Sequence, residues 1–376
     1  DEDRNGAAQK GILDPTPNPR RLRQNSVTEH KLNAQLFSAV LEWDYENYTL
    51  KSLTSYQVDD ILVRRDNDRN DLAYLPPFAL LPSEYDPETN KQTTVTQEIN
   101  LVSSEPAFGK LDWIAGLFYL DTEIEISILE RLDFGFDGVF DPFTIDDIYA
   151  YSGDVGFITD SKPERDSTSL YGQGTWNHSD TLRTVFGLRY TRDEVYSAVT
   201  NFYGRSGTDI LETSGNKITG RLVIENDLSD NTMLYGSFTR GYKPGGSNLT
   251  YGRENVIAPI VVLPTFTEEV VDAFEVGLKS DLADGRVRLN TAAFFYNYEG
   301  LQYQATDPEV FEGGVGNIPE SEIFGAEFEL SAFLSDSVIL DARMAYLDTE
   351  ITADHLALDN VNSEAATNAL LGQGLA

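Results

Sequence analysis

The sequence predicts an all-β fold, an antiparallel transmembrane β-barrel segment of about 12 strands, with short periplasmic turns and long extracellular loops. Three observations support this prediction. Short polar turns repeat about fifty residues apart, apolar and polar residues alternate on both sides of each turn, and all three tryptophans lie beside such turns.

The repeated turns are the first observation. Their aspartates are Asp180, Asp230, Asp284 and Asp336, so successive steps are 50, 54 and 52 residues. Two earlier segments, 44–47 and 107–110, fit the same pattern at longer steps. Asp and Gly suit tight turns because both tolerate left-handed backbone. The repeating unit is therefore two strands joined by a short turn.

The flanks of the turns predict the strands, because apolar residues alternate there with small or polar ones and β-branched and aromatic residues are frequent. The expected strands are 31–43, 48–58, 93–104, 111–123, 167–177, 182–194, 217–226, 232–243, 269–280, 286–298, 323–332 and 338–350. The longer joins are 59–92, 124–166, 195–216, 244–268 and 299–322. Alternation of short turns with long loops is typical of an outer-membrane barrel. The chain then divides into an extracellular loop region at 1–30, a barrel segment at 31–350 and a truncated extracellular loop region at 351–376.

Alternation also separates an apolar face from a charged face. In 323–332, for example, Phe324 and Phe328 share one face while Glu327 and Glu329 share the other. In a barrel the charged row faces a wet lumen, whereas in a soluble sandwich it faces bulk water. The residues expected to face the lumen are Arg189, Glu275, Lys279, Glu327, Glu329 and Arg343.

The tryptophans favour the barrel. Trp43, Trp113 and Trp176 each lie within three residues of a short turn, and indole rings prefer the membrane–water interface. We therefore expect them to form a membrane-interface girdle at the periplasmic end. Tyrosines near the long-loop ends would form the opposite girdle: Tyr119, Tyr190, Tyr242, Tyr296 and Tyr298.

Composition narrows the classes of function. The net charge of −34 argues against a nucleic-acid partner, and the absence of Cys excludes a disulfide scaffold and thiol catalysis. The longest uncharged apolar run, 255–264, is too short for a membrane-spanning helix. The sequence contains His30, His178 and His355, but no nucleophile motif that could form a catalytic site with one of them and no phosphate-binding motif. We expect no enzyme, no cofactor and no metal centre.

Candidate ligand contacts lie in the long loops. The segment 133–154 carries six Asp and several aromatic residues, which could contact a cation, a sugar or a catecholate. A surface loop whose aromatics pack on one another is the alternative. Residues 66–71 (DNDRND) begin like a calcium loop but lack its Gly and its final Glu. The ligand-binding candidates are Asp133, Phe136, Asp137, Phe140, Asp141, Tyr149, Tyr151, Tyr242 and Lys243.

Residues 232–247 (TMLYGSFTRGYKPGGS) resemble the TonB-dependent receptors, the energy-coupled importers of Gram-negative outer membranes. Three further stretches are similar to barrel strands of that family: 169–189 (SLYGQGTWNHSDTLRTVFGLR), 269–302 (EVVDAFEVGLK…RVRLNTAAFFYNYEGLQ) and 317–330 (NIPESEIFGAEFEL). The resemblance implies a barrel of 22 strands around an N-terminal plug. A short box before the plug would contact the energy-transducing complex. This sequence shows neither plug nor box, so we expect an internal barrel segment.

The function that the resemblance implies is TonB-dependent import of a scarce solute, such as a siderophore, a cofactor or an oligosaccharide. The expected partners are a TonB-type complex acting through the plug, outer-membrane lipid and the small-molecule or oligosaccharide ligand. The expected location is the outer membrane. Two alternatives stay open: a passive porin-like channel, which would share the strands and turns, and a soluble sugar-binding β protein.

Overall fold

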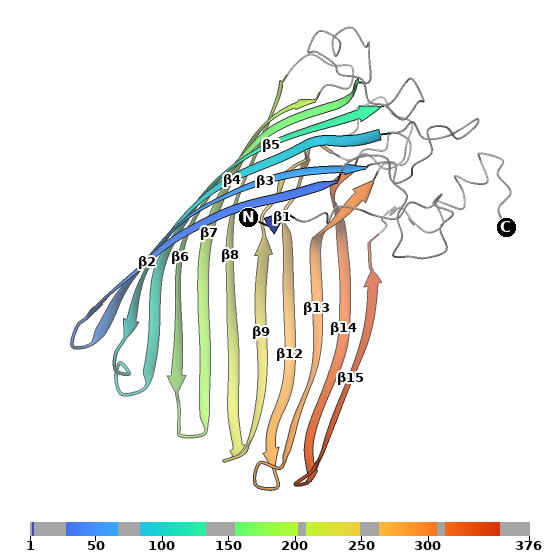
Figure 1. The fold of residues 1–376 in the computed structure, drawn as a ribbon. Helices are drawn as coiled ribbons and strands as arrows, with labels where there is room; N and C mark the ends of the chain where they lie inside the picture. Colours follow the sequence, from blue (N-terminus) through green and yellow to red (C-terminus); the bar gives the residue numbers. More distant parts are fainter. Residues whose placement is uncertain are drawn as a thin grey trace, which may run out of the picture.

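Twelve long antiparallel strands make up most of the described chain in the computed structural model (Figure 1). The structure describes residues 2–3, 28–66, 83–132, 155–201, 208–248, 263–306 and 313–353. The long strands are β2 (Glu29–Asp44), β3 (Tyr48–Asp66), β4 (Ser83–Ser103), β5 (Leu111–Leu132), β6 (Val155–Asn177), β7 (Leu182–Asn201), β8 (Thr208–Ser229), β9 (Thr232–Lys243), β12 (Glu269–Leu282), β13 (Val287–Thr306), β14 (Gly313–Ser335) and β15 (Val338–Ile351). Three short strands complete the set: β1 (Glu2–Asp3), β10 (Gly246–Ser247) and β11 (Thr265–Phe266).

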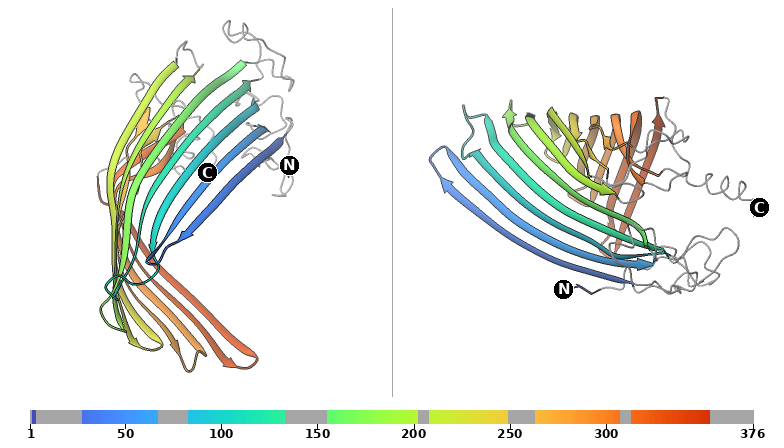
Figure 2. Two further views of the ribbon diagram at one scale, coloured as in Figure 1. Left: turned by 90° about the vertical axis from the view of Figure 1, so that its left-hand side faces the viewer. Right: turned by 90° about the horizontal axis from the view of Figure 1, so that it is seen from above.

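Each long strand pairs with its neighbours along the chain, so the sheet is an uninterrupted meander. The order is β1 to β9 and then β12 to β15, while β10 and β11 pair only with each other. Figure 2 shows that this sheet is strongly curved and forms an open trough. The curvature gives the sheet a concave inner face and a convex outer face. Within the described residues, β15 ends the sheet on one side, and β1 with β2 ends it on the other.

All short turns lie at one end of the trough (Figure 1). The turn between β12 and β13 shows how such a turn is made, because Ala283, Asp284 and Gly285 all take left-handed backbone, with φ of 51°, 57° and 79°. Gly and Asp accept that conformation at low cost. The six predicted turns and twelve predicted strands all occur in the described chain.

The pairing register separates the two faces. On the outer face apolar side chains are widely exposed: Leu188 of β7 is 69% exposed and Leu170 of β6 is 59% exposed. The described residues bury few apolar side chains, namely Val185, Val199, Val223, Val270, Phe294, Ile318 and Ala332. The strands are therefore held together by backbone hydrogen bonds and not by a hydrophobic core between two layers.

The strands extend further toward the long-loop end than the sequence predicts. β4 begins at Ser83 and β6 at Val155, where strands were expected from 93 and 167. On the outer face charged residues follow the last apolar ones, as Arg240 and Asp272 follow Phe238 and Phe274. Alternation of apolar and polar residues ceases there, while the backbone ladder continues. The pattern that predicts strands therefore stops before the strands do.

Two further expectations were wrong in detail. The segment 244–268, predicted as a loop without strands, contains β10 and β11, and β1 within the predicted loop region 1–30 pairs with β2. The predicted tyrosine girdle is also divided. Tyr119 and Tyr190 lie on the outer face, but Tyr296 stacks on Phe294, with 4.8 Å between ring centroids, on the inner face. Tyr298 follows Tyr296 by two residues and shares its face.

No helix of the described chain has the length and apolar character needed to cross a membrane.

Candidate functional site on the inner face

The six charged residues predicted to face a lumen all lie on the inner face. Arg189 is on β7, Glu275 and Lys279 on β12, Glu327 and Glu329 on β14, and Arg343 on β15. Glu329 is the direct cross-strand neighbour of both Asn290 and Arg343, and Asn290 is the neighbour of Lys279. One polar row therefore crosses four strands.

Arg189 is held by aromatic rings and hydroxyl groups. Its guanidinium carbon lies 5.3 Å from the Phe118 ring centroid and 5.2 Å from the Tyr171 ring centroid. It donates hydrogen bonds to Ser169 Oγ (2.9 Å) and Thr191 Oγ1 (3.2 Å). A guanidinium between aromatic faces is stabilised by the ring quadrupoles. These contacts bind β5, β6 and β7 together in the middle of the wall.

Two inner-face tyrosines lie flat across glycines of the next strand. The Tyr171 hydroxyl donates to Glu98, and a Cβ at Gly116 would lie 2.5 Å from the Tyr171 ring. In the same way Tyr235 donates to Glu275 Oε1 (2.5 Å), and a Cβ at Gly277 would lie 2.5 Å from its ring. The ring covers a glycine that offers no side chain of its own for packing.

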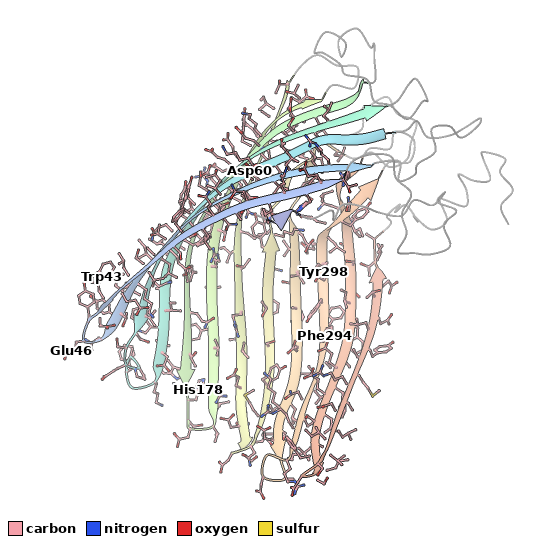
Figure 3. All side chains as sticks on the ribbon, viewed as in Figure 1. Trp43, Glu46, Asp60, His178, Phe294 and Tyr298 are labelled. Atoms are coloured by element: carbon pink, nitrogen blue, oxygen red, sulfur yellow. The ribbon has the colours of Figure 1, made fainter. Side chains whose placement is uncertain are left out.

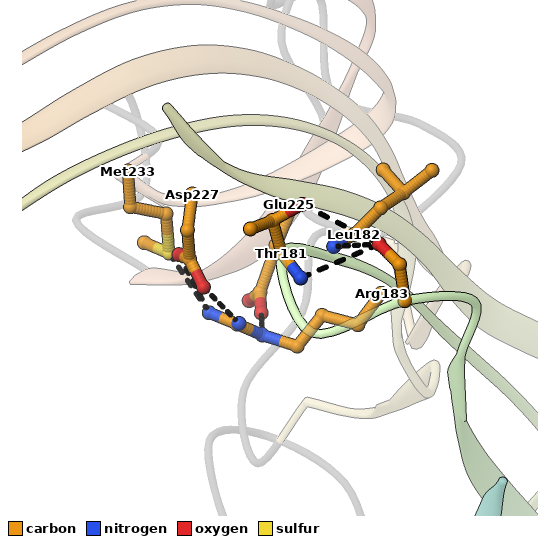
Figure 4. A network of polar contacts seen from close by, with 7 residues as sticks. Thr181, Leu182, Arg183, Glu225, Asp227 and Met233 are labelled. Carbon is orange, nitrogen blue, oxygen red and sulfur yellow. Dashed lines mark hydrogen bonds and ion pairs between the residues drawn. The ribbon is translucent and has the colours of Figure 1, made fainter. Parts of the chain in front are cut away.

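A polar network fastens the short-turn end of β7 to β8 (Figure 4). Arg183 donates from Nε to Glu225 Oε2 (2.5 Å) and from Nη1 to Asp227 Oδ2 (2.8 Å), and it contacts Met233 Sδ at 3.2 Å. Beside it a hollow of about 420 Å³ opens at this end of the inner face. Its walls carry both signs of charge, from residues that include Asp227, Asp230, Lys279, Asp281 and Arg288.

At the opposite end a second cluster gathers above the apolar band. Arg165 of β6 donates to Asp193 Oδ1 of β7 (2.8 Å), and Asp193 is only 2% exposed. Lys217 of β8 pairs with Glu268, which precedes β12. The Tyr242 hydroxyl reaches over β8 to within 3.3 Å of the position of a Cβ at Gly215. Burial, and then the charge of Asp193, raise the pKa of Tyr242 above its ordinary value.

Tyr242 reaches this cluster because β9 leaves β8 early. The two strands pair only as far as Gly220 and Arg240, while β9 stays paired with β12 up to Lys243 and Glu269. Of the ligand-binding candidates, only Tyr242 and Lys243 belong to the described chain; the others, in 133–154, lie outside the described residues. Lys243 is exposed at the end of β9.

The three tryptophans all lie near short turns on the outer face, on β2, β5 and β6 (Figure 3 labels Trp43). Their contact with an interface stays a prediction. The sequence did not predict the cluster at the long-loop end that contains Arg165, Asp193, Lys217 and Glu268. Arg165 and Glu268 fall in segments predicted as loops, and nothing in their local sequence marks them. Within the described residues no group of three acidic or histidine side chains is placed to hold a metal ion.

Comparison with known proteins gives the family. The chain matches the model "TonB dependent receptor-like, beta-barrel" over residues 2–372. The probable TonB-dependent siderophore receptor PiuA of Acinetobacter baumannii is 26% identical over 191 residues, which are 50% of this chain and 24% of that protein. The metal-pseudopaline receptor CntO of Pseudomonas aeruginosa is 24% identical over 195 residues, 51% of this chain and 25% of that protein.

Solved structures share the fold. The crystal structure of PiuA superposes with a TM-score of 0.65 at 17% identity, covering 91% of this chain and 51% of PiuA. The ferric yersiniabactin uptake receptor FyuA of Yersinia pestis superposes with a TM-score of 0.63 at 16% identity, covering 86% of this chain and 43% of FyuA. The chain thus spans about half the length of these solved receptors. With its antiparallel curved sheet and its match to the barrel model over nearly all residues, the chain belongs to the TonB-dependent receptor family.

Proposed function

We propose that this chain is part of the barrel wall of an outer-membrane receptor that imports a scarce solute by TonB-dependent transport. The observation that carries the proposal is that the sheet of this family member combines an apolar outer face with a charged inner face. In a barrel of 22 strands the inner face would enclose a plug, and further strands would pair with the two edges of the sheet. The plug would connect the receptor to a TonB-type complex.

The solute is proposed to be a metal chelate. Among the similar proteins, PiuA is described as a siderophore receptor, FyuA as a ferric yersiniabactin uptake receptor, CntO as a metal-pseudopaline receptor and OprC as a copper transporter. Contacts with the solute are proposed at the long-loop end, where Tyr242 and Lys243 lie, and residues 133–154, which follow β5 in the sequence, supply Asp, Phe and Tyr as further candidates. A cofactor or an oligosaccharide is the alternative solute.

The outer face argues against a soluble sugar-binding protein. Leu188 and Ile218 are each more than 60% exposed on neighbouring strands, and a soluble surface rarely displays so large an apolar band. A passive porin would have the same outer face, so only transport measurements separate it from an importer.

The test is uptake by a strain whose only receptor is the full-length protein. Iron-55 would be supplied as hydroxamate and as catecholate chelates, and copper(II) in parallel, with and without a protonophore. Saturable uptake of at least one of these that stops when the inner membrane is de-energised supports the proposal. Uptake that neither saturates nor responds to the protonophore would overturn it in favour of a passive channel.

A further inference from the structure

A short element between β9 and β12 crosses the inner face. We call it the strap and define it as residues 244–248 and 263–268, which include β10 and β11. Gly246 pairs with Phe266 and Ser247 with Thr265, and Asn248 N donates to Pro264 O (2.8 Å). The strap contacts β7 and β8 on one side and β14 on the other, although β9, β12 and β13 lie between them in the sheet. It therefore spans the concave side of the trough.

Three amide side chains attach the strap to the wall. Asn248 Nδ2 donates to Val315 O (3.0 Å) and to Leu263 O (2.8 Å), while its Oδ1 accepts from Val315 N (2.8 Å). Asn317 accepts from Thr267 N (2.8 Å) and donates to Thr267 O (3.0 Å). Gln302 Nε2 donates to Pro244 O (2.8 Å) and Thr267 O (3.0 Å).

These attachments occur where neighbouring strands have ended. The β12–β13 backbone ladder extends only as far as Val270 and Glu299, and beyond it Gln302 N donates to the Glu269 side chain of β12 (2.7 Å). β15 pairs with β14 only as far as Ile351 and Ser321, so Val315 lies beyond β15. Backbone groups at such strand edges need partners when they are buried. For Val315 the strap supplies those partners, through the side chain of Asn248.

Gly300 permits the close approach of the strap to β13. Its φ is +67°, and a Cβ at this position would lie 2.5 Å from Glu268 O. On the other side of the trough the Lys217–Glu268 ion pair joins the strap to the inner face of β8. The strap is thus held at both sides, by amides on β13 and β14 and by a charge pair on β8.

We propose that Asn248 is a positioning residue for import, and that it fixes the strap to β14 so that a solute entering from the long-loop end must pass a rigid element. This inference rests on the proposed import function. Asn248 is 4% exposed, and all three of its side-chain hydrogen bonds go to backbone groups. It acts toward Val315 as a strand partner does, through one donor and one acceptor.

The test uses hydrogen exchange of the full-length receptor in membranes and compares Asn248→Ala, Asn248→Asp and the control Asn216→Ala. Asn216 is exposed on the outer face of β8. Loss of the bond to Val315 N should accelerate exchange in the peptide around residue 315 by about fivefold in Asn248→Ala, since one such bond contributes about 1 kcal/mol. Asn248→Asp keeps an acceptor oxygen for Val315 N but places a second oxygen against Leu263 O and Val315 O, so it should also accelerate exchange around residue 315. Peptides of β13 below Glu299 should not change.

Uptake measured in the same variants tests the functional half. Asn248→Ala should raise the half-saturating concentration of the chelate that the parent imports several-fold, with an unchanged amount of folded receptor, while Asn216→Ala leaves it unchanged. Unchanged exchange around residue 315 in Asn248→Ala would overturn the attachment, and altered exchange with unchanged uptake would overturn the positioning role. If the parent shows no energised uptake, the proposed function fails, and the exchange result still decides whether Asn248 holds the strap.

Discussion

At the scale of single residues, the inner wall depends on contacts that only a missing Cβ allows. Tyr171 covers Gly116, Tyr235 covers Gly277, and a Cβ at Gly325 would lie 2.3 Å from the Phe294 ring. An aromatic ring spread over a glycine fills the space left on the neighbouring strand and stiffens it. The alternating pattern predicts which face each residue takes, but it does not indicate that these residues pair.

We expect Gly277→Ala to destabilise the folded receptor by about 1–3 kcal/mol, because the added Cβ overlaps the Tyr235 ring and forces it off its rotamer. The measurement is the urea midpoint of the full-length protein, followed by heat-modifiable electrophoresis. Gly236→Ala is the matched control, since its Cβ would have only Glu275 O nearby, at 4.0 Å. Equal midpoints for the two variants would contradict the prediction.

Tyr242 lies two residues beyond Arg240, above the apolar band, and its pKa is raised above 10.0 by burial and by Asp193. The folded state therefore favours the neutral phenol. That contribution to stability is complete below the ordinary pKa and is lost as the pH rises toward the folded pKa. The ultraviolet difference titration between the parent and Tyr242→Phe should show no phenolate absorbance near pH 10. A phenolate signal with a midpoint at pH 10 would show that Tyr242 is not buried beside Asp193.

At the scale of elements, strand pairing depends on more than apolar alternation. The outer part of β4 and residues 159–166 of β6 are mainly polar on both faces, yet their backbones continue the ladder, interrupted by a register shift between Tyr85 and Glu88 and another between Leu129 and Arg131 of β5. At the other end, Arg183 joins β7 to β8 and holds Glu225 and Asp227 together on one face. The ends of the strands are thus fixed by ladders and by polar side chains.

Arg183→Gln should weaken the β7–β8 hairpin, since Glu225 and Asp227 would then face each other without a cation. We expect a cost of about 1 kcal/mol, because Arg183 is 30% and Glu225 24% exposed and water screens the pair. Arg221→Gln, on the same face of β8, is the control, as Arg221 makes no ion pair with any residue that the structure describes. The readout is the urea midpoint in low salt, and an effect of Arg221→Gln equal to that of Arg183→Gln would refute the role of the network.

At the scale of the whole molecule, the curved sheet turns one face outward over all strands. That face is apolar from the short turns to the level of Tyr119 and Tyr190, and charged beyond them. The apolar height matches strands that cross a bilayer at a tilt, which need about 9–11 residues. The proposal that lipid covers this face therefore rests on the outer surface of the whole sheet and not on the pattern of a single strand.

Leu188→Arg should reduce insertion of the full-length receptor into vesicles, since an arginine on the lipid face costs about 2–4 kcal/mol near the middle of the bilayer. Gln173→Arg on the inner face of β6 should insert like the parent, because its side chain would remain in water. The measurement is the fraction of heat-modifiable protein after refolding into lipid. Equal loss in both variants would contradict the assignment of faces.

The sequence by itself determined the twelve long strands of the described residues, the short turns, the faces and the resemblance to the family. These features depend on residues close together along the chain, where the period of two and the turn residues are directly visible. Only the tertiary structure decided the strap, the reach of Tyr242 to Asp193 and the division of the tyrosines. Lys217 and Glu268 are 51 residues apart, and Asn248 and Val315 are 67 apart. The curvature of the sheet brings such residues together, and no local pattern records that curvature.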